Sequence, residues 1–254
     1  AFAGGSQPFA GVDDPEELER PALRGKLLIE PRKLDGFSTL LTVNYNKVLQ
    51  PQGEWVKWPE AGLQSAYPTQ ATMFEPRSLS GIADTSWILS DRLTFENTYS
   101  YTDLSVRRFA PPGQGYVEID GYEMLEEPRL RFTGLDGRLT GLGGLHAFHA
   151  SQDELFNFTS FGGDNYFKDL TTTYAAFGEA TYSVLSDVDV TLGGRLEREN
   201  RRRQLLQGGV TAVNLDETYE VFLPKAGAAW HVEENWTVGA TVARGADGRD
   251  RLGL

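Results

Sequence analysis

Paired strand-like runs joined by very short polar turns recur along the chain, and this rhythm constrains the fold more than any other feature. The turns lie at residues 32–35, 89–91, 135–137, 185–187 and 233–235, about 50 residues apart. Polar loops of roughly 12–28 residues are expected between successive hairpins. Tight turns at one end of a long antiparallel meander and long loops at the other are typical of bacterial outer-membrane β-barrels. The spacing predicts about ten long strands, with short periplasmic turns and long extracellular loops.

The strand-like runs alternate between apolar and polar residues with a period of two, as a strand with two different faces requires. One run places these residues on its apolar face: Val188, Val190, Leu192, Gly194 and Leu196. The alternation persists over about 9–15 residues, whereas strands of soluble sheets usually have about 5–6. A tilted strand needs about 9–11 residues to cross a bilayer. A soluble sandwich would alternate in the same way, but strand length and loop asymmetry favour a transmembrane barrel.

The composition agrees with a barrel and argues against several other classes. The 254 residues are 40% hydrophobic and contain no apolar run of the length, about 18 residues, that a membrane-spanning helix needs. The net charge of −12 argues against a nucleic-acid partner, which requires a basic surface. Cysteine is absent, so the chain has neither disulfides nor a cysteine-built metal site.

Aromatic residues stand beside several of the short turns. They are Trp87, Tyr182, Trp230 and Trp236. Rings at strand ends are typical of the interfacial girdle of a membrane barrel, where the ring lies at the level of the lipid headgroups. The alternative is ordinary cross-strand packing within hairpins. Their repetition beside several turns favours the girdle.

Two hairpins resemble those of TonB-dependent outer-membrane receptors. The first combines residues 174–182, the turn 185–187 and the strand 190–197; the second runs from 222–227 to 236–245. Weaker similarities lie at residues 24–28 and 127–139, so that the resemblance covers about residues 23–245. The chain is therefore similar to the barrel portion of that family.

This resemblance implies a 22-stranded barrel closed by an N-terminal plug domain, in the outer membrane of a Gram-negative bacterium. Such receptors import iron–siderophore complexes, cobalamin, haem or glycans with energy delivered through TonB. The implied partners are outer-membrane lipid, a plug domain, TonB and an iron–siderophore or similar scarce nutrient.

The expected organisation is a polar leader over residues 1–22, a partial barrel over 23–245 and an irregular tail over 246–254. We expect neither a plug nor a TonB-contacting box in residues 1–22. Residues 246–251 also stand where the family would have an aromatic and a Pro-Gly-Gly-like loop. We therefore expect a fragment that lacks the plug and the C-terminal strands, with a truncation or frameshift near residue 245.

Aromatic side chains in two predicted extracellular loops are candidates for ligand contact. The candidates are Trp55, Trp58, Phe156, Phe158, Phe161, Tyr166 and Phe167. Such rings could stack on a ligand, or they could pack the loops together over the barrel mouth. Charged candidates for the lumen wall are Arg129, Arg131, Glu179, Arg195 and Glu197. Cross-strand ion pairing is the simpler interpretation of these charges.

No arrangement of residues predicts catalysis, a metal site or a cofactor, and the chain is not expected to be an enzyme. His146 and His149 should point to opposite faces of one strand and so cannot share a metal ion. No Gly-x-Ser-x-Gly motif occurs. The alternative function is a soluble all-β module, either glycan-binding or propeller-like. A repeat near 50 residues matches some propeller blades, but each blade has four short strands.

Overall fold

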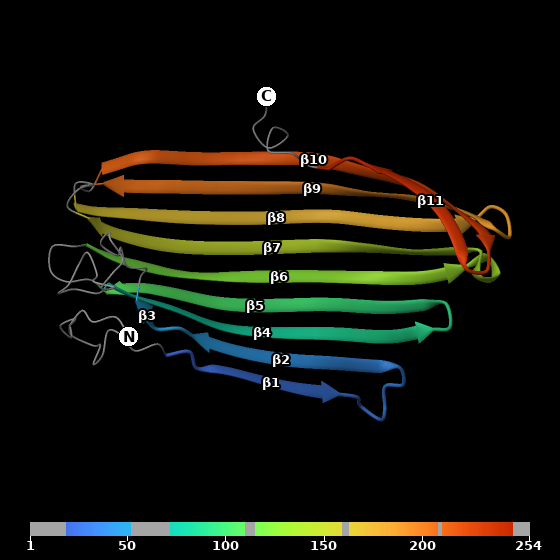
Figure 1. Ribbon diagram of the computed structural model, residues 1–254, viewed down its shortest axis with the longest axis horizontal. Helices are drawn as coiled ribbons and strands as arrows, with labels where there is room; N and C mark the ends of the chain where they lie inside the picture. The colour runs from blue at the N-terminus through green and yellow to red at the C-terminus, as the bar shows by residue number, and fades with distance from the viewer. Residues whose placement is uncertain (1–18, 52–71, 110–114, 159–162, 208–209, 246–254) are drawn as a thin grey trace, which may run out of the picture.

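The computed structural model describes residues 19–51, 72–109, 115–158, 163–207 and 210–245, which form one antiparallel sheet. Neighbouring strands follow the chain order, and a two-residue strand, β3 (Gln50–Pro51), pairs with β4 beside this path (Figure 1). The remaining strands are β1 (Ala22–Ile29), β2 (Phe37–Lys47), β4 (Met73–Ser90), β5 (Leu93–Phe109), β6 (Tyr116–Gly134), β7 (Leu139–Phe158), β8 (Gly163–Ser183), β9 (Val188–Gln207), β10 (Val210–Glu233) and β11 (Trp236–Ala243). The predicted antiparallel meander of about ten strands is confirmed, and the four-stranded blades of a propeller are not seen in the described part of the chain.

The five predicted turns join the strands at one end of the sheet (Figure 1). Between β6 and β7 the turn is a three-residue 3-10 segment, η1 (Leu135–Gly137). Its residues Leu135, Asp136 and Gly137 have φ of 49°, 53° and 90°. Consecutive positive φ values match the twist of the flanking strands in tight hairpins. In the described residues, no helix is long and apolar enough to cross a membrane.

At the opposite end, the strands extend much farther than the sequence predicts. β7 ends at Phe158 and β8 begins at Gly163, while β9 ends at Gln207 and β10 begins at Val210. Similarly, β5 ends at Phe109 and β6 begins at Tyr116. The prediction of loops of 12–28 residues is therefore wrong for these three connections, and residues 155–158 and 163–167 are strand rather than loop. Backbone pairing continues to these ends of β7 to β10. In β9 the side chains on both faces are polar from Arg198 to Gln204, so the alternation in hydropathy fades before the strand ends. Strands β7 to β10 have 20 or more residues.

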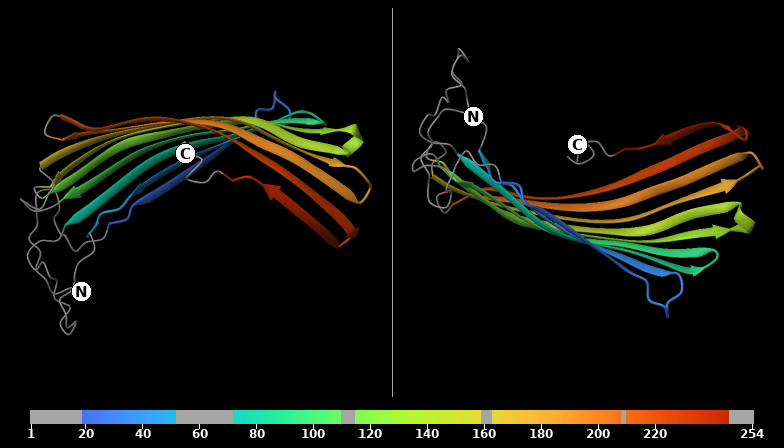
Figure 2. Two further views of the ribbon diagram at one scale, coloured as in Figure 1. Left: turned by 90° about the horizontal axis from the view of Figure 1, so that it is seen from above. Right: turned by 60° about the horizontal axis from the view of Figure 1, so that its bottom comes forward.

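The sheet coils along its length, and Figure 2 shows this curvature from two sides. β1 and β11 form its two edges, because each pairs with a single neighbour among the described residues.

One face of the sheet is apolar and exposed. Cross-strand partners share a face, and one such row joins Leu192 of β9, Ala226 of β10 and Val242 of β11. The side chains of Leu192 and Val242 are 62% and 78% exposed. Other large apolar side chains exposed on this face are Leu23, Leu27, Val43, Leu79, Leu145, Leu196, Phe222 and Val238. This arrangement is the opposite of a soluble sandwich, which buries its apolar face, and it identifies the sheet as the wall of a membrane barrel.

Close packing on the other face allows a test of the strand register. A Cβ on Gly144 would lie 2.7 Å from both a ring carbon of Phe177 and the carbonyl oxygen of Pro128. We expect Gly144→Ala to destabilise the folded sheet by about 1–3 kcal/mol, because the Pro128 carbonyl oxygen belongs to the backbone of the neighbouring strand and cannot move aside without shifting that strand. The adjacent Gly143 is the matched control, since its Cβ would meet only the Phe177 carbonyl oxygen at 3.8 Å. Urea unfolding in detergent micelles measures both variants, and equal midpoints would contradict the register.

Candidate ligand-binding site

Acidic and basic side chains on neighbouring strands pair across the polar face of the sheet. Arg131 Nε donates to Glu96 Oε1 at 2.9 Å, and Lys225 Nζ donates to Glu179 Oε2 at 2.6 Å. On β9, Arg195 Nε donates to Glu197 Oε2 at 2.8 Å. The register places all five predicted lumen residues on this face, namely Arg129, Arg131, Glu179, Arg195 and Glu197. Charges that are paired in this way leave the face hydrophilic without a large local excess of one sign.

The histidines confirm that the two faces differ. His146 Nδ1 lies 2.9 Å from Glu127 Oε2 on the polar face. His149 belongs to the apolar face, where its ring nitrogens lie 3.3 Å from the Tyr122 hydroxyl and 3.0 Å from Thr172 Oγ1. The two imidazoles therefore point in opposite directions, as the sequence predicts. The described residues contain no group of His, Cys, Asp and Glu that could hold a metal ion.

A hollow of about 790 Å³ lies on the polar face, at the end of the sheet away from the short turns. It is formed by the ends of β7, β8 and β9. Its lining residues are Glu154, Phe156, Asn165, Phe167, Arg203, Leu205 and Gln207. They face the same side because the register pairs Phe156 with Asn165, Glu154 with Phe167, and Asn165 with Gln207. We call this hollow the polar-face site.

Two rings and a guanidinium group form the centre of the polar-face site. Phe156 and Phe167 meet edge to face, with ring centroids 5.6 Å apart. The Arg203 Cζ lies 5.1 Å from the centroid of Phe167, within the range of a cation–π contact. Arg203 Nη1 is also 3.5 Å from Asp169 Oδ2, while its side chain stays half exposed. The site therefore offers flat apolar surfaces and an accessible, permanently positive group.

The structure brings only some of the predicted aromatic residues together. Phe156 and Phe167 share the polar-face site, whereas Tyr166 lies on the opposite face and is 48% exposed. Phe158 is the last residue of β7. Trp55, Trp58 and Phe161 lie outside the described residues. Ligand contact stays a prediction for this whole set.

Arg203 and the polar residues beside it are not among the residues predicted from the sequence. The signal that would have found them is the period of two, which continues from Glu197 through Glu199, Arg201, Arg203 and Leu205. Both faces are charged along this part of β9, so the period is not visible as alternating hydropathy.

Aromatic residues border the apolar face at two levels. Trp87, Tyr182, Trp230 and Trp236 lie beside the short turns, as predicted. Trp230 Nε1 donates to Asp187 Oδ2 at 3.0 Å, so its polar atom is anchored at the turn. A second level, missed from the sequence, includes Tyr174, which is 61% exposed. Tyr174 and Tyr182 lie on the same face of β8, about 26 Å apart along the strand. At a strand tilt of about 45° this is about 19 Å along the membrane normal, less than the apolar band of about 25 Å.

A coiled antiparallel meander with an exposed apolar face and an ion-paired polar face defines the wall of a transmembrane β-barrel. The chain belongs to the family of TonB-dependent receptor-like β-barrels, whose family model matches residues 32–248.

Solved structures share this fold. The ferric yersiniabactin uptake receptor FyuA from Yersinia pestis superposes with a TM-score of 0.71 at 15% identity, over 93% of this chain and 39% of that receptor. The ferric preacinetobactin receptor BauA from Acinetobacter baumannii gives 0.67 at 12%, over 88% and 39%. The alcaligin outer-membrane receptor FauA from Bordetella pertussis gives 0.67 at 11%, over 87% and 34%. The chain thus spans less than half the length of these receptors.

Proposed function

We propose that this chain forms part of the barrel wall of an outer-membrane receptor that imports an iron–siderophore complex or a similarly scarce nutrient, with energy delivered through TonB. The observation that carries the proposal is the family match over residues 32–248. Solved structures of the same fold include receptors for ferric yersiniabactin, ferric preacinetobactin and alcaligin. The function is transport rather than catalysis, and it takes place in the outer membrane of a Gram-negative bacterium.

In the proposed orientation, the apolar face contacts lipid and the polar face lines the lumen, where it contacts a plug domain. This orientation is supported by exposed leucines and valines on one face and by paired charges on the other. The short turns then lie at the periplasmic side, and the polar-face site opens toward the outside of the cell. Trp87, Tyr182, Trp230 and Trp236 form the periplasmic girdle.

The chemistry of the polar-face site fits a flat, negatively charged chelate. Phe156 and Phe167 offer rings for stacking, and Arg203 supplies a positive charge that is half exposed. Planar guanidinium groups bind carboxylates and similar oxyanions well. Trp55, Trp58, Phe158 and Phe161 are further proposed contacts, whereas Tyr166 faces the other side of the sheet and is not among them.

Uptake by living cells tests this function. We expect that disruption of the gene encoding this chain in its bacterium abolishes uptake of radioactive iron from the siderophores of spent, iron-poor medium. Uptake of glucose, which is not an iron chelate, provides the control, and complementation with the intact gene should restore the lost iron uptake. Because TonB supplies the energy, a proton uncoupler should stop uptake in the parent strain. Uptake that continues unchanged after disruption, for every ferric chelate offered, would rule the proposal out.

A further inference from the structure

The polar-face site contains a carboxylate whose charge is not balanced by a basic side chain. Glu154 of β7 lines the hollow and is half-buried. Its carboxylate accepts a hydrogen bond from the side-chain amide of Gln152, and it forms no ion pair with any residue that the structure describes. An amide donor does not neutralise a negative charge, so a half-buried carboxylate of this kind favours the approach of a cation.

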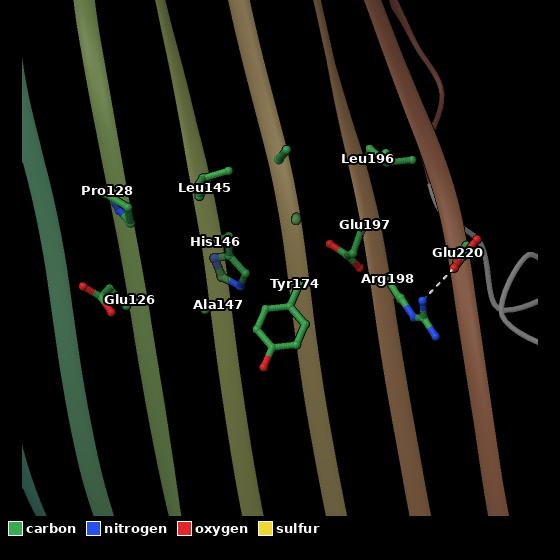
Figure 3. Close-up of a pocket in the computed structure, with 12 residues that line it drawn as sticks. Glu126, Pro128, Leu145, His146, Ala147, Tyr174, Leu196, Glu197, Arg198 and Glu220 are labelled. Atoms are coloured by element: carbon green, nitrogen blue, oxygen red, sulfur yellow. Dashed lines mark ion pairs between the residues drawn. The ribbon is translucent and has the colours of Figure 1, made fainter.

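Most carboxylates of the neighbouring strands β8 and β9 do have a basic partner. A similar pair joins β9 to β10, where Arg198 Nη1 lies 3.5 Å from Glu220 Oε1, as the dashed line in Figure 3 shows. At the polar-face site, Asp169 Oδ2 lies 3.5 Å from Arg203 Nη1 and offsets its charge. The negative charge of Glu154 therefore remains in excess at this end of the sheet.

An aromatic ring stands next to this carboxylate. Phe156 and Glu154 share one face of β7 and are two positions apart, which is about 7 Å along the strand. An ammonium group is attracted to a carboxylate by its opposite charge, and to the face of an aromatic ring by the ring quadrupole. Glu154 and Phe156 together therefore offer suitable surroundings for a protonated amine.

Arg203 lies at the opposite side of the hollow, on β9. Because β8 runs between β7 and β9, two strand spacings, about 10 Å, separate Glu154 from Arg203 across the sheet. Phe167 of β8 lies between them: it pairs with Glu154 in the register, and its ring contacts the Arg203 guanidinium. The hollow thus presents a negative group, an aromatic ring and a positive group in order across three strands.

We propose that the polar-face site recognises a ferric chelate that carries a protonated amine in addition to its anionic groups. The amine binds between Glu154 and Phe156, an anionic group of the chelate binds Arg203, and a planar ring packs against Phe167. A chelate with anionic groups alone fits less well, because the carboxylates of Glu154 and Asp169 repel it. This inference rests on the transport function proposed above and specifies the class of chelate.

Two small aromatic probes that differ by a single positive charge test this recognition. The first is para-(aminomethyl)benzoate, whose ammonium and carboxylate groups lie on opposite sides of one ring. In the second, para-(acetamidomethyl)benzoate, the amine is blocked, while the ring and the carboxylate are the same. The protein is extracted from outer membranes in mild detergent, and saturation-transfer NMR measures the Kd of each probe. We expect the amine to bind about tenfold more tightly, the effect of one charge-assisted hydrogen bond.

Three variants assign the two charges of the probe to their partners. Glu154→Gln should raise the Kd of the aminomethyl probe about tenfold and leave that of the acetamidomethyl probe unchanged. Arg203→Gln should instead weaken both probes, since both carry the carboxylate. Glu123→Gln is the matched control, because Glu123 lies on the polar face of β6 but outside the hollow. A heat-shifted band on unboiled gels verifies that each variant is folded.

The results separate this inference from the transport function. Equal Kd values for the two probes, a preference for the amine that survives in Glu154→Gln, or binding of neither probe would overturn the amine site and leave the transport function standing. Iron uptake that continues after gene disruption would instead overturn the transport function. A preference for the amine that is lost in Glu154→Gln would then still show an amine-binding site on the polar face.

Discussion

Leu192→Arg is expected to destabilise the membrane-embedded barrel by about 2–4 kcal/mol, the cost of an arginine near the midplane of the lipid-facing side of a barrel. Leu192 lies within the apolar stretch of β9 between Val188 and Leu196, and its side chain is 62% exposed. Its new guanidinium group would have to leave water for hydrocarbon or pull lipid headgroups inward. Urea titration of the protein in phosphatidylcholine vesicles measures the loss as a lower unfolding midpoint.

Thr140→Arg is the control for this effect. Thr140 is exposed on the polar face of β7, where an added cation remains hydrated and meets other charged side chains. We expect the urea unfolding midpoint of the Thr140→Arg variant to stay close to that of the unaltered protein. If Thr140→Arg destabilised the barrel as much as Leu192→Arg does, the assignment of the two faces would be wrong.

Substitution of either Phe167 or Arg203, which form the cation–π contact at the centre of the polar-face site, should weaken ligand binding strongly. We expect Phe167→Ala and Arg203→Ala each to raise the Kd for the ferric chelate about tenfold, because the first removes a stacking surface and the second its cation–π partner. Arg203→Ala should lose more affinity at low ionic strength than at high, since salt screens an exposed charge. Quenching of intrinsic tryptophan fluorescence by the ferric chelate measures the Kd in both conditions.

Tyr166→Ala provides a matched control in the same strand. Tyr166 precedes Phe167 but faces the other side of the sheet. If the Kd is unchanged for Tyr166→Ala and raised for Phe167→Ala, the ligand binds on the polar face. A raised Kd for Tyr166→Ala with an unchanged Kd for Phe167→Ala would show that the ligand does not bind at the polar-face site.

The faces and the turns of this fold could be predicted from the sequence because each has a local physical cause. In β9 the alternation of Val188, Val190 and Leu192 with Asp189 and Thr191 determines which side chains share a face, since the period of a strand is two. The turn at 135–137 ends in glycine, which accepts a positive φ. Neither inference requires knowledge of a distant part of the chain.

The ends of the strands and the polar-face site could not be predicted in the same way. The run Arg201-Arg202-Arg203 places charges on both faces, so its hydropathy carries no period even though the backbone is strand. Phe156, Phe167 and Arg203 come together only through the register of three strands. Register depends on how many residues each connection between hairpins contains, and the connections between β7 and β8 and between β9 and β10 are much shorter than predicted.

The long strands also determine how far the barrel wall rises above the bilayer. The apolar face of β9 ends at Leu196, but the strand continues to Gln207. At about 3.3 Å per residue and a tilt of about 45°, that extension raises its tip about 25 Å above the hydrocarbon. In the proposed orientation, a peptide epitope inserted between β9 and β10 would be displayed on a stiff support clear of the lipid headgroups. Antibodies added to intact cells could therefore label the receptor at the surface without permeabilisation.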